Sequence, residues 1–200
     1  MKQLIKGEVP DFLVKFLLHK RPKTWDDTTP IRQELREYIL KEQSNFCAYT
    51  ELRINKLEDC HIDHYHTRNL FPDKTFEYGN MLVSCNAEEY GAKHKDKCVK
   101  AKKDYDELIN PLEELPSEYI EFGLTGNVYS VNNSTKGENT ISYFNLNEKS
   151  LVERRKTVVS NMLKMKDYLT EEEMVASLGE FQTMVRQLYK DCKEISDNHL

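Results

Sequence analysis

The run from Cys60 to His66, Cys-His-Ile-Asp-His-Tyr-His, places three histidines and one aspartate within seven residues. Turn-forming and polar segments flank this run, which favours a short extended element over a long helix. On a strand alternate side chains share a face, so Asp63 and His64 point to opposite sides unless the strand ends or bends there. We therefore expect a functional site at the end of a strand near Asp63 and His64.

The chain has 200 residues, of which 32% are charged and 38% are hydrophobic, and its mean hydropathy is −0.72. These values are typical of one soluble domain, or of a small domain with helical additions. No uninterrupted apolar stretch is long enough to cross a membrane, and the first eight residues lack the apolar core of a signal peptide. We therefore expect a cytoplasmic protein that has no membrane partner.

The predicted fold class is α+β, with three consecutive regions inside one compact unit. Residues 1–45 are predicted as an N-terminal helical segment, and residues 46–103 as a central module. Residues 104–200 are predicted as short strands and C-terminal helices packed on that module. The first region ends in a predicted helix over residues 30–43, which Thr29 can cap and whose first turn contains Pro30.

The central region opens with two extended runs, residues 46–54 and 60–65, and a polar segment joins them. This pattern predicts a β-hairpin. A loop follows, and residues 80–85 then lead into a charged stretch that is compatible with a helix. The expected order is strand, strand, loop and helix.

The third region contains strand-like segments at residues 117–122, 127–131 and 140–145, separated by turn-forming residues. Two helices are predicted to close the chain, over residues 151–168 and 171–195. Two capping boxes indicate where these helices begin, one formed by Ser150 with Glu153 and the other by Thr170 with Glu173. The apolar stripe of the last helix is predicted to contact a partner, and it comprises Met174, Leu178, Phe181 and Val185.

Ionisable side chains in the central region suggest hydrolytic chemistry. Phosphodiester hydrolysis needs a base that deprotonates water, a cation that holds the phosphate, and a group that orients the base. Histidine suits the first task because its pKa lies near neutrality, and a neighbouring carboxylate offers a ligand for a metal ion. Asp63 and His64 supply both groups side by side.

Three motifs resemble those of HNH endonucleases, and within them the retron-associated and Septu-type PtuB group of bacterial anti-phage systems. They are Cys47-Ala48-Tyr49-Thr50-Glu51, the run His61-Ile62-Asp63-His64-Tyr65-His66, and the run from Tyr78 to Asn86. Most of residues 30–165 take part in the resemblance. It implies a ββα-metal (HNH) core with small added β-strands and flanking N- and C-terminal helices.

The resemblance also implies roles for individual residues. His64 matches the general base, Asp63 a metal ligand, and Asn80 the residue that orients the base through backbone contacts. His94 is the favoured last metal ligand, because a helical histidine is a common ligand, and Asn86 is the alternative. The expected cofactor is Mg²⁺ or Mn²⁺, and Zn²⁺ is a further candidate.

The five cysteines form an odd set, which argues against a disulfide framework in a cytosolic chain. Members of the family commonly bind a structural zinc through two cysteine pairs. Here Cys47 and Cys85 match, whereas Thr50 and Tyr90 stand at the partner positions. Cys60 and Cys98 are candidates to complete a rebuilt zinc site, but cysteines packed as small apolar residues are the favoured interpretation.

The net charge of −5 argues against general coating of nucleic acids, although lysines cluster after position 92. Such runs usually face water; alternatively, they attract a phosphate backbone. The candidate nucleic-acid contacts are Arg68, Lys93, Lys95 and Lys97.

The function that the resemblance implies is metal-dependent cleavage of nucleic acid, with DNA favoured over RNA, in anti-phage defence. Its implied partners are nucleic acid, a PtuA-type ATPase and retron components. The alternative is a catalytically weakened HNH-like subunit that binds nucleic acid or a partner.

Overall fold

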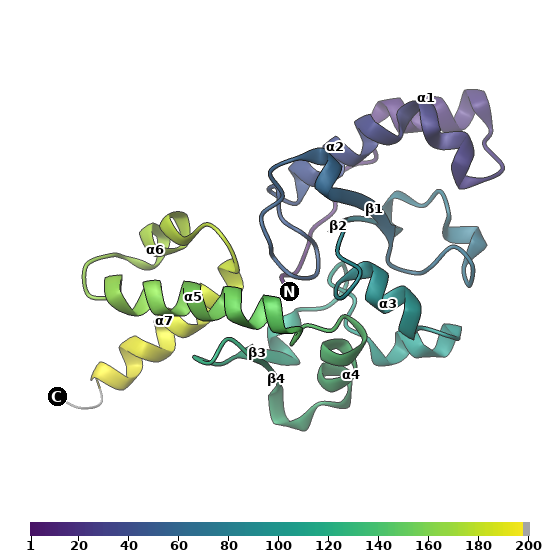
Figure 1. The fold of residues 1–200 in the computed structure, drawn as a ribbon. Helices are drawn as coiled ribbons and strands as arrows, with labels where there is room; N and C mark the ends of the chain where they lie inside the picture. Colours follow the sequence, from purple (N-terminus) through teal and green to yellow (C-terminus); the bar gives the residue numbers. More distant parts are fainter. Residues whose placement is uncertain (198–200) are drawn as a thin grey trace.

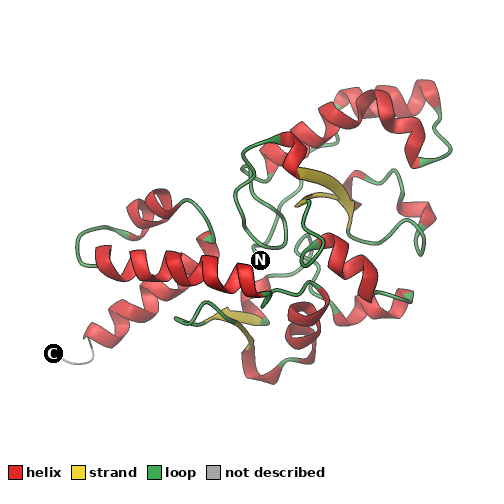
Figure 2. Ribbon diagram, viewed as in Figure 1, coloured by secondary structure: helices red, strands yellow, loops and turns green. Residues whose placement is uncertain are grey.

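The computed structural model describes residues 1–197, with side chains as far as residue 192. Short antiparallel strand pairs and helices make up an α+β fold (Figures 1 and 2). The helices are α1 (Asp11–Lys20), α2 (Arg32–Glu42), α3 (Ala92–Cys98), α4 (Thr135–Tyr143), α5 (Lys149–Met165), α6 (Glu171–Leu178) and α7 (Gln182–Asp197). The strands are β1 (Cys60–His64), β2 (Met81–Cys85), β3 (Ile120–Phe122) and β4 (Val128–Ser130). Among the described residues no helix is both long and apolar enough to cross a membrane.

The β1–β2 pair forms the centre of the region that carries the histidines. The strands run antiparallel, with Asp63 opposite Leu82 and His64 opposite Met81. Helix α2 packs on β2, and the pair lies between α2 and α3 in Figure 1. Because Met81, Leu82 and Val83 are fully buried, β2 forms part of the hydrophobic core. This buried strand gives β1 a fixed partner, and β1 ends at His64, as expected for a site at the end of a strand.

The second strand pair, β3 with β4, packs against α4 and α7. Helices α5, α6 and α7 contact one another and form the group on the left of Figure 1. Their apolar side chains face inward, and Met174, Phe181 and Val185 are buried. The prediction that this stripe contacts a partner is therefore wrong for these three residues, because the stripe fills the chain's own core.

The predicted hairpin between residues 46–54 and 60–65 is wrong. Within residues 46–54 the only pairing is an isolated bridge between Phe46 and Arg53, which closes a tight turn. Glu51 has a positive φ of 58° in this turn, and its amide donates to the Cys47 carbonyl at 3.1 Å. The partner of β1 is β2, because the apolar run of β2 gains more by burial than the polar residues after the turn.

Residues 140–145, predicted as a strand, belong mostly to α4. The Ser134 side chain caps this helix by accepting from the Gly137 amide at 3.2 Å. Gly137 also permits close packing, since a Cβ there would lie 2.2 Å from the Tyr119 carbonyl oxygen. The cap and the close approach outweigh the strand preference of the β-branched and aromatic residues that follow.

The helix boundaries agree in part with the sequence. The Thr170–Glu173 capping box is confirmed at the start of α6. Glu148 caps α5 in place of Ser150, and Ile31 stands at the N-cap of α2 with no side-chain cap. The long helix predicted over residues 171–195 is divided in two. Gly179 ends α6 in the left-handed conformation, and Phe181 has a φ of 50°.

Gln43 connects α2 to the open edge of β2. Its amide nitrogen donates to the carbonyls of Phe46 and Val83 at 2.8 and 2.9 Å, and its oxygen accepts from the Val83 amide at 2.7 Å. The side chain is buried, so each bond satisfies a backbone group that water cannot reach. Gln43 thus fixes the strand against which β1 and the site are built.

Replacing Gln43 with alanine should lower the free energy of unfolding by about 3 kcal/mol, because buried backbone groups lose their partners. Urea denaturation measures this loss. The matched control is Gln33→Ala, an exposed glutamine on the same helix, which should change the stability by less than about 0.5 kcal/mol. Equal effects of the two substitutions would show that Gln43 does not anchor β2.

Candidate functional site

A cleft of about 860 Å³ opens at the end of β1. Its walls come from β1, from the loop after it, and from α3 with the residues that follow. The lining residues are His61, Ile62, Asp63, His64, Thr67, Arg68, Asn69, Leu70, Lys93, Asp96, Val99 and Lys100. The structure thus brings Asp63, His64, Arg68 and Lys93 to one cleft, while their roles stay predictions.

His64 is the last residue of β1, and only 5% of its surface is exposed. Its Nε2 lies 2.9 Å from the Thr75 carbonyl oxygen, and its ring meets the Trp25 ring edge-on at 4.5 Å between centroids. A carbonyl can only accept, so Nε2 carries the hydrogen and Nδ1 carries the lone pair. Burial lowers the pKa of His64 to about 4, so the imidazole is neutral at pH 7.

Asn80 holds the chain immediately after His64. Its side-chain amide donates to the carbonyls of His66 and Lys74 at 3.0 and 3.2 Å, and its oxygen accepts from the His66 amide at 2.8 Å. The Asn80 carbonyl also accepts from the Tyr65 amide at 2.9 Å. These are backbone contacts of the kind expected of a residue that orients the base, although the role itself stays a prediction.

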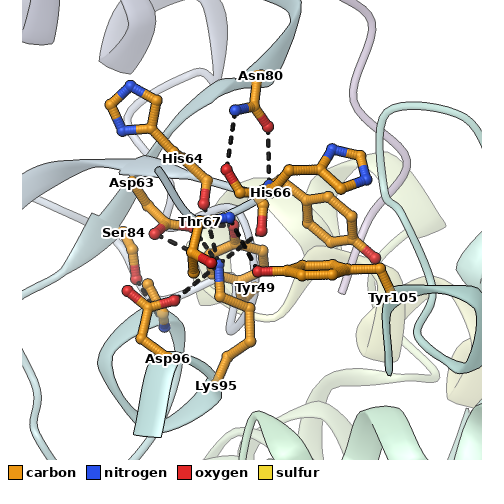
Figure 3. Close-up of polar contacts among 12 residues, drawn as sticks. Tyr49, Asp63, His64, His66, Thr67, Asn80, Ser84, Lys95, Asp96 and Tyr105 are labelled. Atoms are coloured by element: carbon orange, nitrogen blue, oxygen red, sulfur yellow. Dashed lines mark hydrogen bonds and ion pairs between the residues drawn. The ribbon is translucent and has the colours of Figure 1, made fainter. Parts of the chain in front are cut away.

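Asp63 points toward the buried Lys95 (Figure 3). Its Oδ2 accepts from the Tyr49 hydroxyl and lies 3.1 Å from Lys95 Nζ. Burial alone raises the pKa of Asp63, but the charge of Lys95 and the Tyr49 hydroxyl outweigh it and lower that pKa below its usual value. Asp63 is therefore a charged carboxylate whose Oδ2 accepts from Tyr49 and Lys95, while its Oδ1 lies 3.4 Å from Lys95 Nζ.

Lys95, on α3, is completely buried. Its ammonium donates to Asp63 and to the carbonyls of His64 and Tyr65 at 3.1 and 2.9 Å, and it lies 3.1 Å from Asp96. Burial lowers the pKa of Lys95, but the charges of Asp63 and Asp96 raise it above its usual value. For Asp96, burial and the nearby charge of Asp63 raise the pKa to about 6. The predicted contact of Lys95 with nucleic acid does not agree with this burial.

The two candidates for the last metal ligand, Asn86 and His94, form their hydrogen bonds with residues other than Asp63. The side-chain oxygen of Asn86 lies 3.0 Å from His61 Nδ1, and its side-chain nitrogen donates to the Glu58 carbonyl at 2.7 Å. His94 Nδ1 lies 2.8 Å from the Tyr143 carbonyl on α4. Among the side chains that the structure describes, no three His, Cys, Asp or Glu residues are arranged to hold a metal ion. A metal centre held by Asp63 with His94 or Asn86 alone stays a prediction.

Among the described residues, Cys47, Cys60, Cys85 and Cys98 take part in no disulfide. Cys47 and Cys85 lie together, with the Cys85 amide 3.4 Å from the Cys47 sulfur. Cys60 donates to the Leu57 carbonyl, and Cys98 lies 3.6 Å from His94 Nδ1. Within the described residues these thiols do not form a four-donor set, and Cys47 and Cys60 pack in the core.

The remaining cations differ in where they point. Arg68, Lys93 and Lys100 line the cleft, and the Arg68 guanidinium lies 5.6 Å from the centre of the Trp25 ring. Lys93 and Lys97 both pair with Glu88, at 2.8 and 2.9 Å, but only Lys93 is among the lining residues. Trp25 and Thr75 were not predicted as site residues, because they come from segments without a recognisable motif. Tyr49 lies in the first motif and Lys100 in the lysine cluster, but neither was assigned a role.

The pKa of His64 leads to a test by nitrogen-resolved NMR. We expect the Nε2–H tautomer at pH 7 and a protonation midpoint near pH 4. The unfolded chain takes up this proton near pH 6.5, so stability should fall as the pH drops from about 6.5 to about 4. The exposed ring of His19 serves as an internal reference. A midpoint near 6.5, or the Nδ1–H tautomer, would contradict the buried geometry.

No family model matches the chain. The chain is similar to the Septu protein PtuB of Bacillus mycoides (strain KBAB4), with 26% identity over 158 residues. The match covers 66% of this chain and 53% of that protein, so the chain spans about half the length of this relative.

Proposed function

We propose that the chain is an HNH-type nuclease subunit that hydrolyses phosphodiester bonds of nucleic acid in bacterial anti-phage defence. The observation that carries the proposal is His64, whose ring is fixed through Nε2 by a carbonyl at the wall of a cation-lined cleft. The order of β1, β2 and α3 supports the proposal that this part of the chain is a ββα-metal (HNH) core. The similarity to a Septu protein supports the role in defence.

In the proposed reaction, Arg68, Lys93 and Lys100 hold the phosphate in the cleft. Nδ1 of His64 accepts a proton from a water molecule as the water oxygen attacks phosphorus, and the bond to the leaving oxygen breaks. An anion bound beside the imidazole favours its protonated form, which raises the basicity of His64 when substrate is present. Asn80 keeps the backbone after His64 in place. No step is assigned to a metal ion, and the dependence on Mg²⁺ or Mn²⁺ stays a prediction.

The biological setting of the proposal rests on the similarity to PtuB. We propose a PtuA-type ATPase as the partner, with retron components as a further possibility, and DNA as the favoured substrate over RNA. The described C-terminal helices use their main apolar residues internally, so contacts with an ATPase must involve other surfaces. The partner is best sought by co-purification with the full chain.

One observation favours a second function, that of a binding subunit with weakened catalysis. Asp63, the residue that matches a metal ligand, is engaged by Tyr49 and Lys95. A cleft that binds a phosphate backbone without cleaving it would retain Arg68 and Lys100 as its working residues. Binding without hydrolysis across DNA, RNA, several metals and the candidate ATPase would favour this function.

Replacing His64 with glutamine should lower the rate of cleavage by at least about 10²-fold, because the general base is lost. The assay uses labelled DNA and RNA, including structured RNA, with the candidate ATPase present. His19→Gln, an exposed histidine on α1, is the matched control and should cleave at the unmodified rate. Circular dichroism checks that both variants are folded. Unchanged cleavage by His64→Gln would refute the proposed mechanism.

Replacing Lys100 with alanine should weaken binding of nucleic acid and reduce the magnitude of the salt-dependence slope by about one, because one phosphate contact is lost. Fluorescence anisotropy at several salt concentrations measures both quantities. Lys97→Ala is the matched control, since Lys97 pairs with Glu88 outside the cleft lining. Equal slopes for the two variants would show that this cleft does not bind the backbone.

A further inference from the structure

Five oxygen atoms surround the ammonium group of Lys95. Both carboxylate oxygens of Asp63 lie at 3.1 and 3.4 Å from Nζ, and one of Asp96 lies at 3.1 Å. The carbonyl oxygens of His64 and Tyr65 complete the set at 3.1 and 2.9 Å. Figure 3 shows these atoms converging on the end of the lysine side chain. We call this group of five oxygens the cation cage.

The donors of the cation cage are those that hard cations select. Carboxylate and backbone carbonyl oxygens are the usual ligands of Ca²⁺, Mg²⁺ and Mn²⁺ in proteins. The Asp63 carboxylate is buried, whereas the Asp96 carboxylate is 46% exposed and lines the cleft. The buried carboxylate and the two carbonyl dipoles form a negative site that must contain a positive charge. Lys95 supplies that charge from within the chain.

The Lys95 side chain cannot readily leave this position to make room for a metal ion. Its side chain is fully buried, and the rings of Tyr49 and Tyr65 stand 5.9 and 5.6 Å from Nζ. The helix that carries it is anchored on both sides, by the Ala92 amide near Ser84 and by His94 near Tyr143. A cation tethered to the chain has a high effective concentration at its site, so it competes favourably with an ion from solution.

We propose that the Lys95 ammonium occupies the cation position of this site, so that Asp63 holds a protein cation in place of a divalent metal ion. Lys95 is then a positioning residue, because it neutralises Asp63 and fixes the two carbonyls that flank the end of β1. Loss of the lysine side chain should open the cation cage to a hard divalent ion. The occupancy of the cage does not depend on the proposed nuclease activity, and the two can fail separately.

The test measures binding of Mn²⁺ to the full chain. The electron paramagnetic resonance signal of the free ion gives the amount that stays unbound. Wild type should have no Mn²⁺ site that depends on Asp63, so adding Asp63→Asn should not change the amount of Mn²⁺ bound. The same holds for Lys97→Ala, which removes an exposed lysine of the same helix. Lys95→Ala should bind one equivalent, and Lys95→Ala combined with Asp63→Asn should lose it. A folded Lys95→Ala protein that binds no Mn²⁺ would overturn the proposal, as would an Asp63-dependent Mn²⁺ site in wild type.

A second measurement needs no substitution and decides the question if Lys95→Ala does not fold. Mn²⁺ is added to isotope-labelled wild-type protein, and the amide signals of His64 and Tyr65 are followed by NMR. We expect these signals to keep their line widths, because no paramagnetic ion enters the cation cage. Selective broadening of both signals would place Mn²⁺ beside Asp63 and contradict the proposal.

Discussion

The buried contact between Lys95 and Asp63 is the interaction on which the site depends. It joins α3 to the end of β1, and the same ammonium group binds the carbonyls of His64 and Tyr65. Breaking a buried ion pair by removing one partner typically costs about 3–5 kcal/mol, because the remaining charge is left uncompensated. The end of β1 is thus held rigidly from the core side, while its other side faces the cleft.

Asp63 and His64 are neighbours in the chain, yet their environments separate their chemistry. Asp63 turns to Lys95 and stays ionised, whereas His64 packs on Trp25 and is neutral, with its pKa lowered by burial to about 4. Adjacent side chains of a strand point to opposite faces, so Asp63 contacts Lys95 of α3 and His64 contacts Trp25. The cleft is lined by the cations Arg68, Lys93 and Lys100, in a chain whose net charge is −5.

Part of this arrangement was predictable from the sequence. Local signals predicted the helix before residue 43 and the capping box at Thr170, because each rests on neighbouring residues. They did not predict β2 as a strand, since residues 80–85 were expected only to lead into a charged stretch. The partner of β1 was mistaken, since two five-residue strands separated by a loop leave no local mark of their pairing. The strand predicted at residues 140–145 failed because a cap and one glycine, both earlier in the chain, decide that segment.

The role of Lys95 was also missed, although a signal for its burial exists. Ala92, Lys95 and Val99 are spaced three and four residues apart and are all buried, so they share the inner face of α3. A lysine on an otherwise apolar helical face needs a buried carboxylate, and Asp63 provides one. The pattern was not recognised because Lys95 stands among five other lysines, and residue type alone does not show which of them faces the core.

A crystal structure of the chain with Mn²⁺ and a short oligonucleotide, recorded at a wavelength where manganese scatters anomalously, tests the central claim most directly. We predict a phosphate beside Nδ1 of His64 and near Arg68, with Lys95 still bonded to Asp63 and no manganese signal between Asp63 and Asp96. Manganese bound to Asp63, with Lys95 turned away from the carboxylate, would contradict the claim.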